Sequence, residues 1–432
     1  MHPPFLFINY YFPPVKVVGA IRLFHLSQEL TDSGHPVIVV TCKNRRLFRQ
    51  DESMHPNVQE IVTVPAWDWR TLRLQLSKNG STVVNQRTKE TSWSQWLIRA
   101  QDSFPLSLLL GDGGLVYIIR AYWRACRLIR KNSIHYLFSS YRPYADHWVG
   151  YLLKLRFPHL FWIADFRDLH VDPTRRNVLW PHLQNRIDQW LLRKATIVTT
   201  VSQGLADKLP AEPNRIHILR NAIPKNLLER RAKNTKKFTI TYTGAIYPAL
   251  QKANLLLQAL SDLLSKQHLA PDHLQLIYLG KDGSVWDGWM QQYRLSSYSF
   301  NCGELSRESA LAQQSASSIN LLLSWSSPEL TGILTSKIYE YLSSGVPTLT
   351  IINGSRDIEL EKLIETTGGG RVFYSQPEQS RAIKQYLLEC YDEWKKKGVA
   401  DHEVNPQKLQ EYTWPEQVKK FRNRLALRTI MV

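Results

Sequence analysis

The segment ELTGILTSKIYEYLSSGVPTLTI combines a polar loop, a short helix pattern and an apolar strand, and it carries a charged pair. Thr335 or Ser336 is a suitable N-cap and Gly345 a suitable stop for the helix. Lys337 lies in the first turn, where the helix dipole disfavours a cation unless an anion is near. Glu340 follows on the same face and can accept both hydroxyls of a ribose. The pair suits a nucleotide; the alternative is a surface pair worth ~0.3 kcal/mol.

Two glycines lie where an apolar run gives way to a helix pattern. Gly19 opens a helix that bears Arg22, and Gly244 ends the run FTITYTG, with Lys252 before the next helix. A glycine lets backbone amides approach a phosphate, which the cations can neutralise. The alternative is a structural glycine at each junction. G-x-G-x-x-G and G-x-x-x-x-G-K-[ST] motifs are absent from the sequence, which argues against a dinucleotide oxidoreductase and a phosphate-loop ATPase.

Polar residues follow two apolar runs of the first half. His147 lies near the start of a helix after HYLFSS, where an imidazole can bond a sugar hydroxyl or a phosphate; the alternative is a capping or partly buried histidine. Asp165, Arg167 and Asp168 follow in WIADFRD, as catalytic candidates or as an internal ion-pair network. These four residues are the catalytic candidates of the chain.

The segment FNCGEL, residues 300–305, is a further candidate for ligand binding around Gly303 to Leu305. The pattern indicates a strand edge whose free backbone N–H and C=O groups can hydrogen-bond to a nucleobase. The alternative is an ordinary turn. The four cysteines are scattered without a C-x-x-C pair, which favours neither a disulfide framework nor a zinc site and fits a reducing compartment.

The elements that must position these residues alternate between short apolar runs and helix patterns. The first half contains FLFINY, VIVVTC, HYLFSS, LFWIADF and TIVTTVS, and the second FTITYTG, LQLIYLG, YSFNCG, SINLLLSW, VPTLTII and RVFYS. Helices are expected at 18–33, 254–267, 306–317 and 357–366. This alternation predicts an α/β protein of two Rossmann-like, doubly wound domains, with ligands at the carboxyl ends of the strands in a cleft between the domains.

Length and composition set the domain count. At about 100–200 residues per domain, 432 residues suggest two or three domains, and we expect two. We expect an N-terminal domain over 1–220, a polar linker over 221–237 and a C-terminal domain over 238–405. A final helix from about Trp414, within 406–432, is expected to pack back toward the first domain.

The charge and hydropathy of the chain indicate which partners and surfaces it could bind. A net charge of +18 attracts nucleic acid, an anionic membrane or a phosphorylated substrate alike. The start MHPPFLFINYYFPP lacks the basic region of a signal peptide and is expected to form a buried strand. Residues 120–131 place arginines at helical spacing around Trp123 and Ile129. We expect either a helix that lies on a membrane surface or a well-solvated basic face.

The chain resembles GT-B glycosyltransferases of family four over nearly its whole length. The resemblance is carried in order by YYFPPVKVVGAIRLFHLSQELTDSGHPVIVVT, SSYRPYADHWVGYLLKLRFPHLFWIADFRD, TVSQGLADKL, ILRNAI, YTGAIYP and TSKIYEYLSSGVPTL. It implies two Rossmann-like domains closing on a nucleotide-sugar, with the nucleotide in the C-terminal domain and the acceptor mainly in the N-terminal one. It also implies transfer with retention of anomeric configuration and without a required metal.

The resemblance also implies roles for single residues. Gly19 matches the glycine near the donor phosphates, His147 the histidine near the transferred sugar, Glu340 the glutamate at the ribose, and Lys252 the lysine that neutralises phosphate. Family members often carry an earlier glutamate that contacts the donor sugar.

This sequence departs from the family where that earlier glutamate would lie. Gly332 stands eight positions before Glu340, and Glu329 lies nearby in the loop. Glu329 could substitute for the missing carboxylate, or the sugar is held differently.

The expected activity is therefore hexosyl transfer in polysaccharide, glycolipid or other glycoconjugate biosynthesis. The donor is expected to be UDP- or GDP-linked, the acceptor a glycan, a lipid-linked sugar or a small molecule, and no cofactor is required. A cytoplasmic protein at the inner face of the membrane fits this activity. The alternatives are a nucleotide-sugar epimerase or hydrolase of the same fold and a basic nucleic-acid-binding protein. The second is disfavoured because the basic residues are spread out and no nucleic-acid module occurs, so nucleic acid is not an expected partner.

Overall fold

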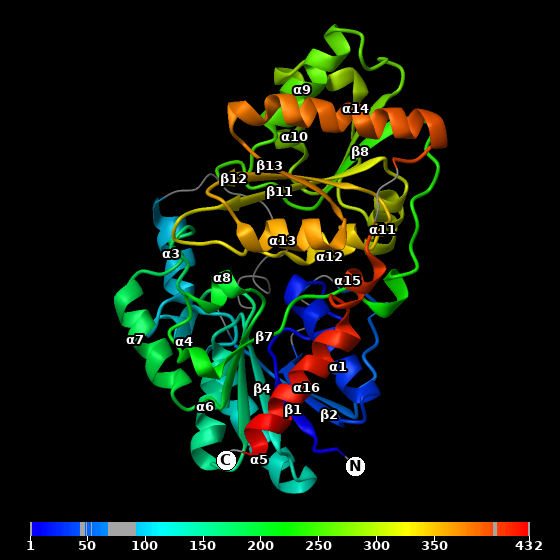
Figure 1. Cartoon of the computed structure of the whole chain (residues 1–432). Helices are drawn as coiled ribbons and strands as arrows, with labels where there is room; N and C mark the ends of the chain where they lie inside the picture. The colour runs from blue at the N-terminus through cyan, green and yellow to red at the C-terminus, as the bar shows by residue number, and fades with distance from the viewer. Residues whose placement is uncertain are drawn as a thin grey trace. The chain divides into compact units, whose positions relative to one another are not determined.

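A computed structural model describes residues 2–43, 48, 50–52, 54–67, 92–400 and 404–430. The chain divides into two compact units, one of 1–220 with 417–432 and one of 221–416 (Figure 1). Each unit is an α/β fold built on a parallel sheet, so the predicted pair of doubly wound, Rossmann-like units is confirmed. The stretch 221–237 belongs to the second unit, and the last helix belongs to the first from Gln417 onward.

The sheet of the first unit has strand order β3-β2-β1-β4-β5-β6-β7. All its neighbouring strands are parallel, as in the register Phe5↔Val37 and Phe5↔Tyr136. Because β1, β2 and β4 to β6 are fully buried, apolar residues dominate their sequences, with a few buried polar positions such as Ser140, Asp165 and Thr199. The strands are β1 (Phe5–Ile8), β2 (Val37–Cys42), β3 (Glu60–Val64), β4 (Tyr136–Tyr141), β5 (Phe161–Phe166), β6 (Ile197–Thr200) and β7 (Ile216–Ile218).

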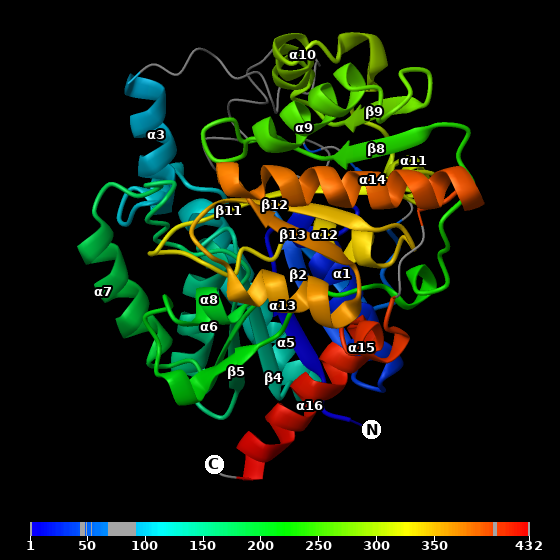
Figure 2. The same ribbon diagram turned by 45° about the horizontal axis from the view of Figure 1, so that its top comes forward.

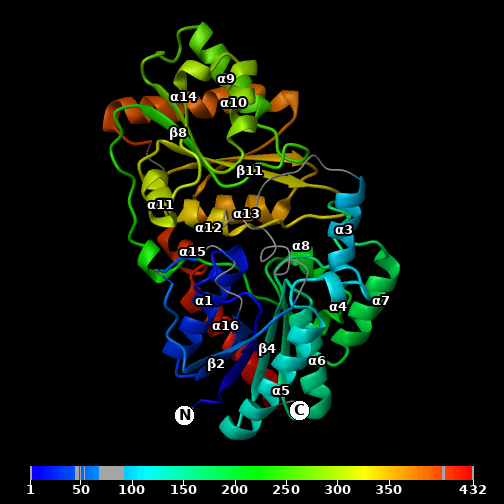
Figure 3. The same cartoon turned by 180° about the vertical axis from the view of Figure 1, so that it is seen from behind.

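Helices connect these strands. Helix α5 packs beside α6 and contacts β1 to β3, whereas α6 contacts β1, β4 and β5 (Figure 3). The helices are α1 (Val18–Asp32), α3 (Ser92–Asp102), α4 (Ser107–Leu110), α5 (Gly114–Asn132), α6 (Ala145–Arg156), α7 (Pro181–Leu192), α8 (Gln203–Ala206) and α16 (Trp414–Ile430), with a 3-10 turn η2 (Pro213–Arg215). The final helix begins at Trp414 as expected. Its Gln417 Oε1 accepts a bond from the Arg220 amide at 3.2 Å.

The sheet of the second unit has strand order β10-β9-β8-β11-β12-β13, also parallel throughout. Its strands are β8 (Phe238–Thr243), β9 (Leu274–Leu279), β10 (Ser299–Asn301), β11 (Ile319–Ser326), β12 (Thr348–Gly354) and β13 (Gly370–Tyr374). Its helices are α9 (Asn254–Ser265), α10 (Gly283–Gln292), α11 (Arg307–Ser315), α12 (Ser336–Leu342), α13 (Ile358–Thr367), α14 (Ser380–Lys397) and α15 (Pro406–Gln410). Short 3-10 turns are η3 (Lys225–Leu227), η4 (Ser296–Tyr298) and η5 (Pro377–Gln379).

Two hydrophobic cores sandwich this second sheet. Leu321 and Leu323 of β11 join the core under α9, α10 and α14, whereas Leu322 joins the core under α12 and α13 (Figure 2). Alternate residues of a strand point to opposite faces, so both faces must be apolar. Among the described residues, no helix is both long and apolar enough to cross a membrane.

Candidate functional site

In the second unit, Lys337 meets Gly244 at the carboxyl end of β8. The ammonium group of Lys337 donates to Tyr242 Oη at 3.2 Å and lies 4.3 Å from the centroid of that ring. Gly244 has φ +100°, and a Cβ there would lie 3.1 Å from both Cε and Nζ of Lys337. Glycine therefore fits both the backbone and the close approach of the lysine. The structure brings these two predicted donor-binding residues together.

Burial sets the protonation of this lysine. Desolvation lowers the pKa of Lys337 to about 8, against the opposing effect of Glu340. Beside it, the amide of Thr243 donates to Tyr341 Oη at 3.0 Å, which ties β8 to α12. The result is a half-buried cation held against the ring of Tyr242 at the turn that follows β8.

Glu340 lies in an arginine-rich environment on α12. Its Oε1 accepts bonds from Arg307 Nη2 at 3.2 Å and Nε at 3.3 Å, and its side chain is 22% exposed. Arg230 donates to the Glu340 carbonyl at 3.2 Å. Burial lowers the pKa of Arg230, while the charge of Glu340 raises it. Arg230 and Arg307 were not predicted, because they reach Glu340 from segments distant in the sequence.

The loop that contains Gly332 is tied to the start of α13. The Gly332 amide donates to Asp357 Oδ2 at 2.8 Å, and Asp357 Oδ1 caps the helix by accepting from Leu360 N at 3.1 Å. Gly332 has φ +70°, which favours glycine. Glu329 is exposed in the same loop. Gly332 itself is buried and its carbonyl accepts from the Leu334 amide at 2.9 Å, so the exposed group of this loop is the carboxylate of Glu329.

The other predicted donor-binding residues lie at loops of the same sheet edge. Gly303 follows β10 with φ +66°, a Cβ placed on it would meet no atom within 4 Å, and Leu305 is 41% exposed. Lys252 is exposed after β8, and its carbonyl accepts from Asn353 Nδ2 at 3.2 Å. Because the carboxyl ends of parallel strands share one edge, these residues lie on the side of the sheet that carries Gly244.

In the first unit, Arg22 and Asp165 form a buried ion pair. Arg22 Nη2 lies 2.9 Å from Asp165 Oδ1 and also donates to the Leu219 carbonyl at 2.8 Å. Ser140 and Thr199 hydroxyls donate to the same carboxylate, each at 2.7 Å. Burial alone would raise the pKa of Asp165, but Arg22 and the hydroxyl bonds outweigh it and lower the pKa.

This burial corrects the predicted roles of Arg22 and Asp165. The residues are 3% and 0% exposed, so a direct contact with phosphate or sugar is not open to them in this structure. They join α1, β4, β5 and β6 at the sheet edge and thereby position the loops that follow. The position of Asp165 matches the internal ion-pair network that was predicted as the alternative to a catalytic role.

Gly19 and Arg167 are in close contact at the start of α1. A Cβ on Gly19 would lie 2.5 Å from Arg167 Cζ, so the guanidinium occupies the space that a side chain would take. Arg167 Nε donates to the Tyr141 carbonyl at 3.2 Å. Arg167 thus lies at the edge where β4, β5 and α1 meet. Asp168 follows it, half-buried, and lines a cavity described below.

His147 is fully buried below this edge. Its Nδ1 lies 2.8 Å from Ser139 Oγ, which accepts from Trp162 Nε1 at 2.9 Å. Burial lowers the pKa of His147 to about 3, so the imidazole is neutral. The predicted bond to a sugar is therefore not available to this side chain as it stands. The buried-histidine alternative describes the geometry.

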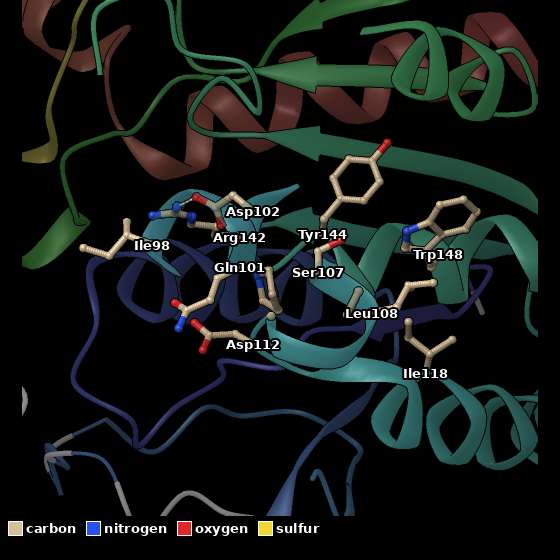
Figure 4. A pocket seen from close by; sticks show the side chains of 13 residues that line it. Ile98, Gln101, Asp102, Ser107, Leu108, Asp112, Ile118, Arg142, Tyr144 and Trp148 are labelled. Atoms are coloured by element: carbon tan, nitrogen blue, oxygen red, sulfur yellow. Dashed lines mark ion pairs between the residues drawn. The ribbon is translucent and has the colours of Figure 1, made fainter. Parts of the chain in front are cut away.

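Two neighbouring cavities open at the carboxyl ends of β4 and β5. The smaller, of about 150 Å³, is drawn in Figure 4, where Asp102 and Arg142 point toward one another as an ion pair. Tyr144 and Trp148 line its other side. The larger, of about 340 Å³, shares Ile98 and Arg142 with the first. Its arginines were not predicted, although the adjacent pair Arg175 and Arg176 shortly after WIADFRD was a usable signal.

The described residues contain no group of three or more histidine, cysteine, aspartate or glutamate side chains arranged to hold a metal ion. The cationic side chains in contact with Glu340 and Gly244 are Lys337, Arg307 and Arg230.

Comparison with solved structures shows a shared fold. No family model matches the sequence, and no curated protein matches it significantly. A sucrose-phosphate synthase from Thermosynechococcus elongatus aligns with a TM-score of 0.63 and 12% identity over 100% of both chains. A glycosyltransferase from Rickettsia africae aligns with a TM-score of 0.59 and 11% identity, over 99% of this chain and 98% of its own.

A lipopolysaccharide outer core galactosyltransferase aligns with a TM-score of 0.59 and 10% identity, over 98% of this chain and 99% of its own. These neighbours are GT-B proteins, so this chain shares the GT-B fold along its whole length. At such identities the likeness concerns the fold.

Proposed function

We propose that the protein is a glycosyltransferase that moves a hexosyl group from a nucleotide-sugar to an acceptor, with retention of configuration. The observation that carries the proposal is the contact between Lys337 and Gly244 at the end of β8, with Glu340 one turn further along α12. A cation, a glycine turn and a carboxylate in this order match the diphosphate and ribose of one nucleotide. The GT-B fold of the whole chain supports it.

The donor is assigned to the second unit. The diphosphate lies at the turn after β8, where Lys337 and the exposed Lys252 neutralise it, and Glu340 accepts the ribose hydroxyls. The backbone around Gly303, beside the exposed Leu305, receives the base of UDP or GDP. In the loop that contains Gly332, the exposed Glu329 offers its carboxylate to the sugar, in place of the carboxylate that the family often has there.

The acceptor is assigned to the first unit, at the edge formed by Arg167 and Asp168. The leaving diphosphate develops negative charge as the glycosidic bond breaks, and fixed cations stabilise that charge. In this proposal Lys337 and Lys252 supply the charge without a metal ion. Chelator-treated protein should therefore keep its activity, and a loss that Mg²⁺ restores would contradict this part of the proposal.

An anionic membrane is the proposed surface on which the acceptor is met, at the cytoplasmic face. Helix α5 exposes Leu115, Ile119 and Trp123 at a spacing of four residues, with exposed fractions of 45%, 48% and 60%. Arg127 and Arg130 are exposed on the same helix, and neighbouring α6 exposes Leu152 and Leu155. An apolar stripe bordered by cations suits insertion at the level of anionic headgroups.

Thermal stability of the whole chain in the presence of UDP, GDP and their sugars tests the donor assignment. We expect one nucleoside diphosphate to raise Tm specifically, because a ligand that binds only the folded state stabilises it. Released nucleotide measured with and without added acceptor then separates transfer from the epimerase and hydrolase alternatives. Turnover that needs an acceptor supports transfer, whereas full turnover without one supports hydrolysis or epimerisation.

A further inference from the structure

The larger of the two neighbouring cavities at the carboxyl ends of β4 and β5 is lined by an excess of positive charge. Its volume is about 340 Å³, and its lining includes four arginines against two aspartates, Asp168 and Asp172. The arginines come from three separate places, namely α3, the end of β4 and the loop after β5. They are Arg99, Arg142, Arg175 and Arg176.

The loop after β5 is held in a defined turn. Asp172 Oδ1 accepts from the amides of Thr174 at 2.8 Å and Arg175 at 2.9 Å, while Asn177 Oδ1 accepts from the Asp172 amide at 2.9 Å. Asn177 Nδ2 donates to the His170 carbonyl at 2.8 Å. The turn thereby sets the backbone from which the two adjacent arginines reach the cavity.

The opposite wall is fixed to the same loop. His170 bridges Asp188 at 2.9 Å and the Asp102 carbonyl at 2.9 Å, and the Leu179 amide donates to Ser103 Oγ at 2.8 Å. These bonds hold the end of α3 to the loop after β5. The distance between the walls is therefore set by the protein before any ligand binds.

Internal pairing leaves part of the charge available. Arg142 pairs with Asp102, and Arg175 lies 3.4 Å from Asp172. Neither Arg99 nor Arg176 has an ion-pair partner among the residues that the structure describes. Arg176 is exposed and lines the cavity. An anion that enters would meet guanidinium groups that no carboxylate already neutralises.

We infer that this cavity binds a phosphate monoester carried by the acceptor. The inference rests on the proposed transferase function, because it names the acceptor of that reaction. Once Arg142 is paired with Asp102 and Arg175 with Asp172, Arg99 and Arg176 remain against the single carboxylate of Asp168, so the lining keeps a net positive charge that attracts a monoester. The oxygens of a monoester also fit the planar fork of a guanidinium. Asp168 lines the same cavity, so an acceptor anchored there lies beside the end of β5.

Glycerol 3-phosphate serves as the probe, titrated calorimetrically into the full-length chain, with glycerol as the neutral control. Arg176→Gln and Arg175→Gln should each weaken binding by about tenfold, the effect of losing one charged hydrogen-bonding partner. Arg176→Lys, which keeps the charge and loses the fork, should lie between wild type and Arg176→Gln. Arg381→Gln removes an exposed arginine of α14 and should leave the affinity unchanged.

Equal affinity in Arg175→Gln, Arg176→Gln and the control variant would overturn the inference, as would binding of glycerol as tight as that of the phosphate. UDP and GDP titrations on the same variants distinguish this failure from that of the proposed function. Loss of nucleotide binding in Lys337→Met with intact glycerol 3-phosphate binding supports two separate sites. Absence of any nucleotide binding by wild type would overturn the transferase proposal and leave the cavity result standing by itself.

Competition identifies the source of the phosphate. Phosphatidate in phosphatidylcholine vesicles that displaces glycerol 3-phosphate supports a lipid-borne monoester. Phosphatidate vesicles that leave the probe bound support a soluble sugar phosphate or a similar small acceptor. In both outcomes Arg176→Gln should weaken binding of glycerol 3-phosphate by about tenfold and leave that of glycerol unchanged.

Discussion

Gly19 offers a sharp test at the residue scale. A methyl group there would lie 2.5 Å from Arg167 Cζ, so Gly19→Ala must displace the guanidinium. Because only the far end of a flexible side chain moves, we expect unfolding free energy to change by less than about 1 kcal/mol. Turnover should fall by about tenfold or more, since misplaced groups lose much of their effect. Urea unfolding measures the free energy of unfolding, and initial rates measure turnover.

Gly288→Ala is the matched control, because a Cβ there meets no atom within 4 Å. It should leave both rate and stability near those of wild type. Full turnover in Gly19→Ala would show that the position of Arg167 is irrelevant to the reaction.

Asp165 should show the opposite behaviour, with stability as the main effect. Asp165→Asn leaves Arg22 buried beside a neutral group, and breaking a buried pair costs about 3–5 kcal/mol. Asp262→Asn, which breaks a solvent-exposed pair with Lys384, should cost less than about 1 kcal/mol. Urea denaturation of both variants compares them, and equal losses would contradict the structural role of Asp165.

The helix that carries Lys337 and Glu340 was predictable from sequence, because one short segment carried the signal. Lys337 and Glu340 lie three positions apart, and their helix runs within the predicted limits. The sequence left open whether His147 and Asp165 are buried, because polar residues after a strand can face the loop or the sheet. Arg142 and Arg176 converge on one cavity from different elements, which no local pattern reveals.

At the scale of elements, buried strands were predicted better than edge strands. The strands β1, β2, β4 and β5 are buried on both faces, and apolar residues therefore dominate their sequences. The two edge strands of the first unit were not predicted. Glu60–Val64 mixes polar and apolar residues, and Ile216–Ile218 has only three residues, so neither stands out from a loop.

The apolar stripe of Leu115, Ile119 and Trp123 on α5 leads to a prediction about membrane binding. Ile119→Ser should weaken binding to vesicles that contain phosphatidylserine by roughly fivefold, because it removes an apolar anchor worth about 1 kcal/mol or more once inserted. Ile358→Ser changes an isoleucine of 53% exposure in the second unit and should have no effect. Vesicle cosedimentation at low salt measures both, and unchanged binding in Ile119→Ser would exclude α5 as the membrane contact.

At the scale of the whole molecule, buried histidines should make the fold sensitive to acid. Burial lowers the pKa of His147 to about 3 and that of His217 to about 4, below the usual value of 6.5. As pH falls below 6.5, these histidines become protonated in the unfolded chain but stay neutral in the native state. The free energy of unfolding therefore falls until the pH drops below the pKa values of the folded state. The slope is at most about 1.4 kcal/mol per pH unit for each histidine.

Urea titrations between pH 7 and pH 4 measure this dependence. His147→Gln should reduce the slope, although its stability at neutral pH is lower because Ser139 loses its partner. An unchanged slope in that variant would mean that other groups cause the acid sensitivity.

The central claim is that the second unit binds a nucleoside diphosphate through Lys337. Calorimetric titration of wild type, Lys337→Met and Lys362→Met with UDP and GDP tests it most directly, with Lys362 as an exposed control. Wild type and the control should bind one nucleotide alike, and Lys337→Met about ten- to a hundredfold more weakly. Wild-type affinity should also fall as pH rises past about 8, where Lys337 loses its charge. Binding that is equal in all three proteins, or absent from wild type, would contradict the account.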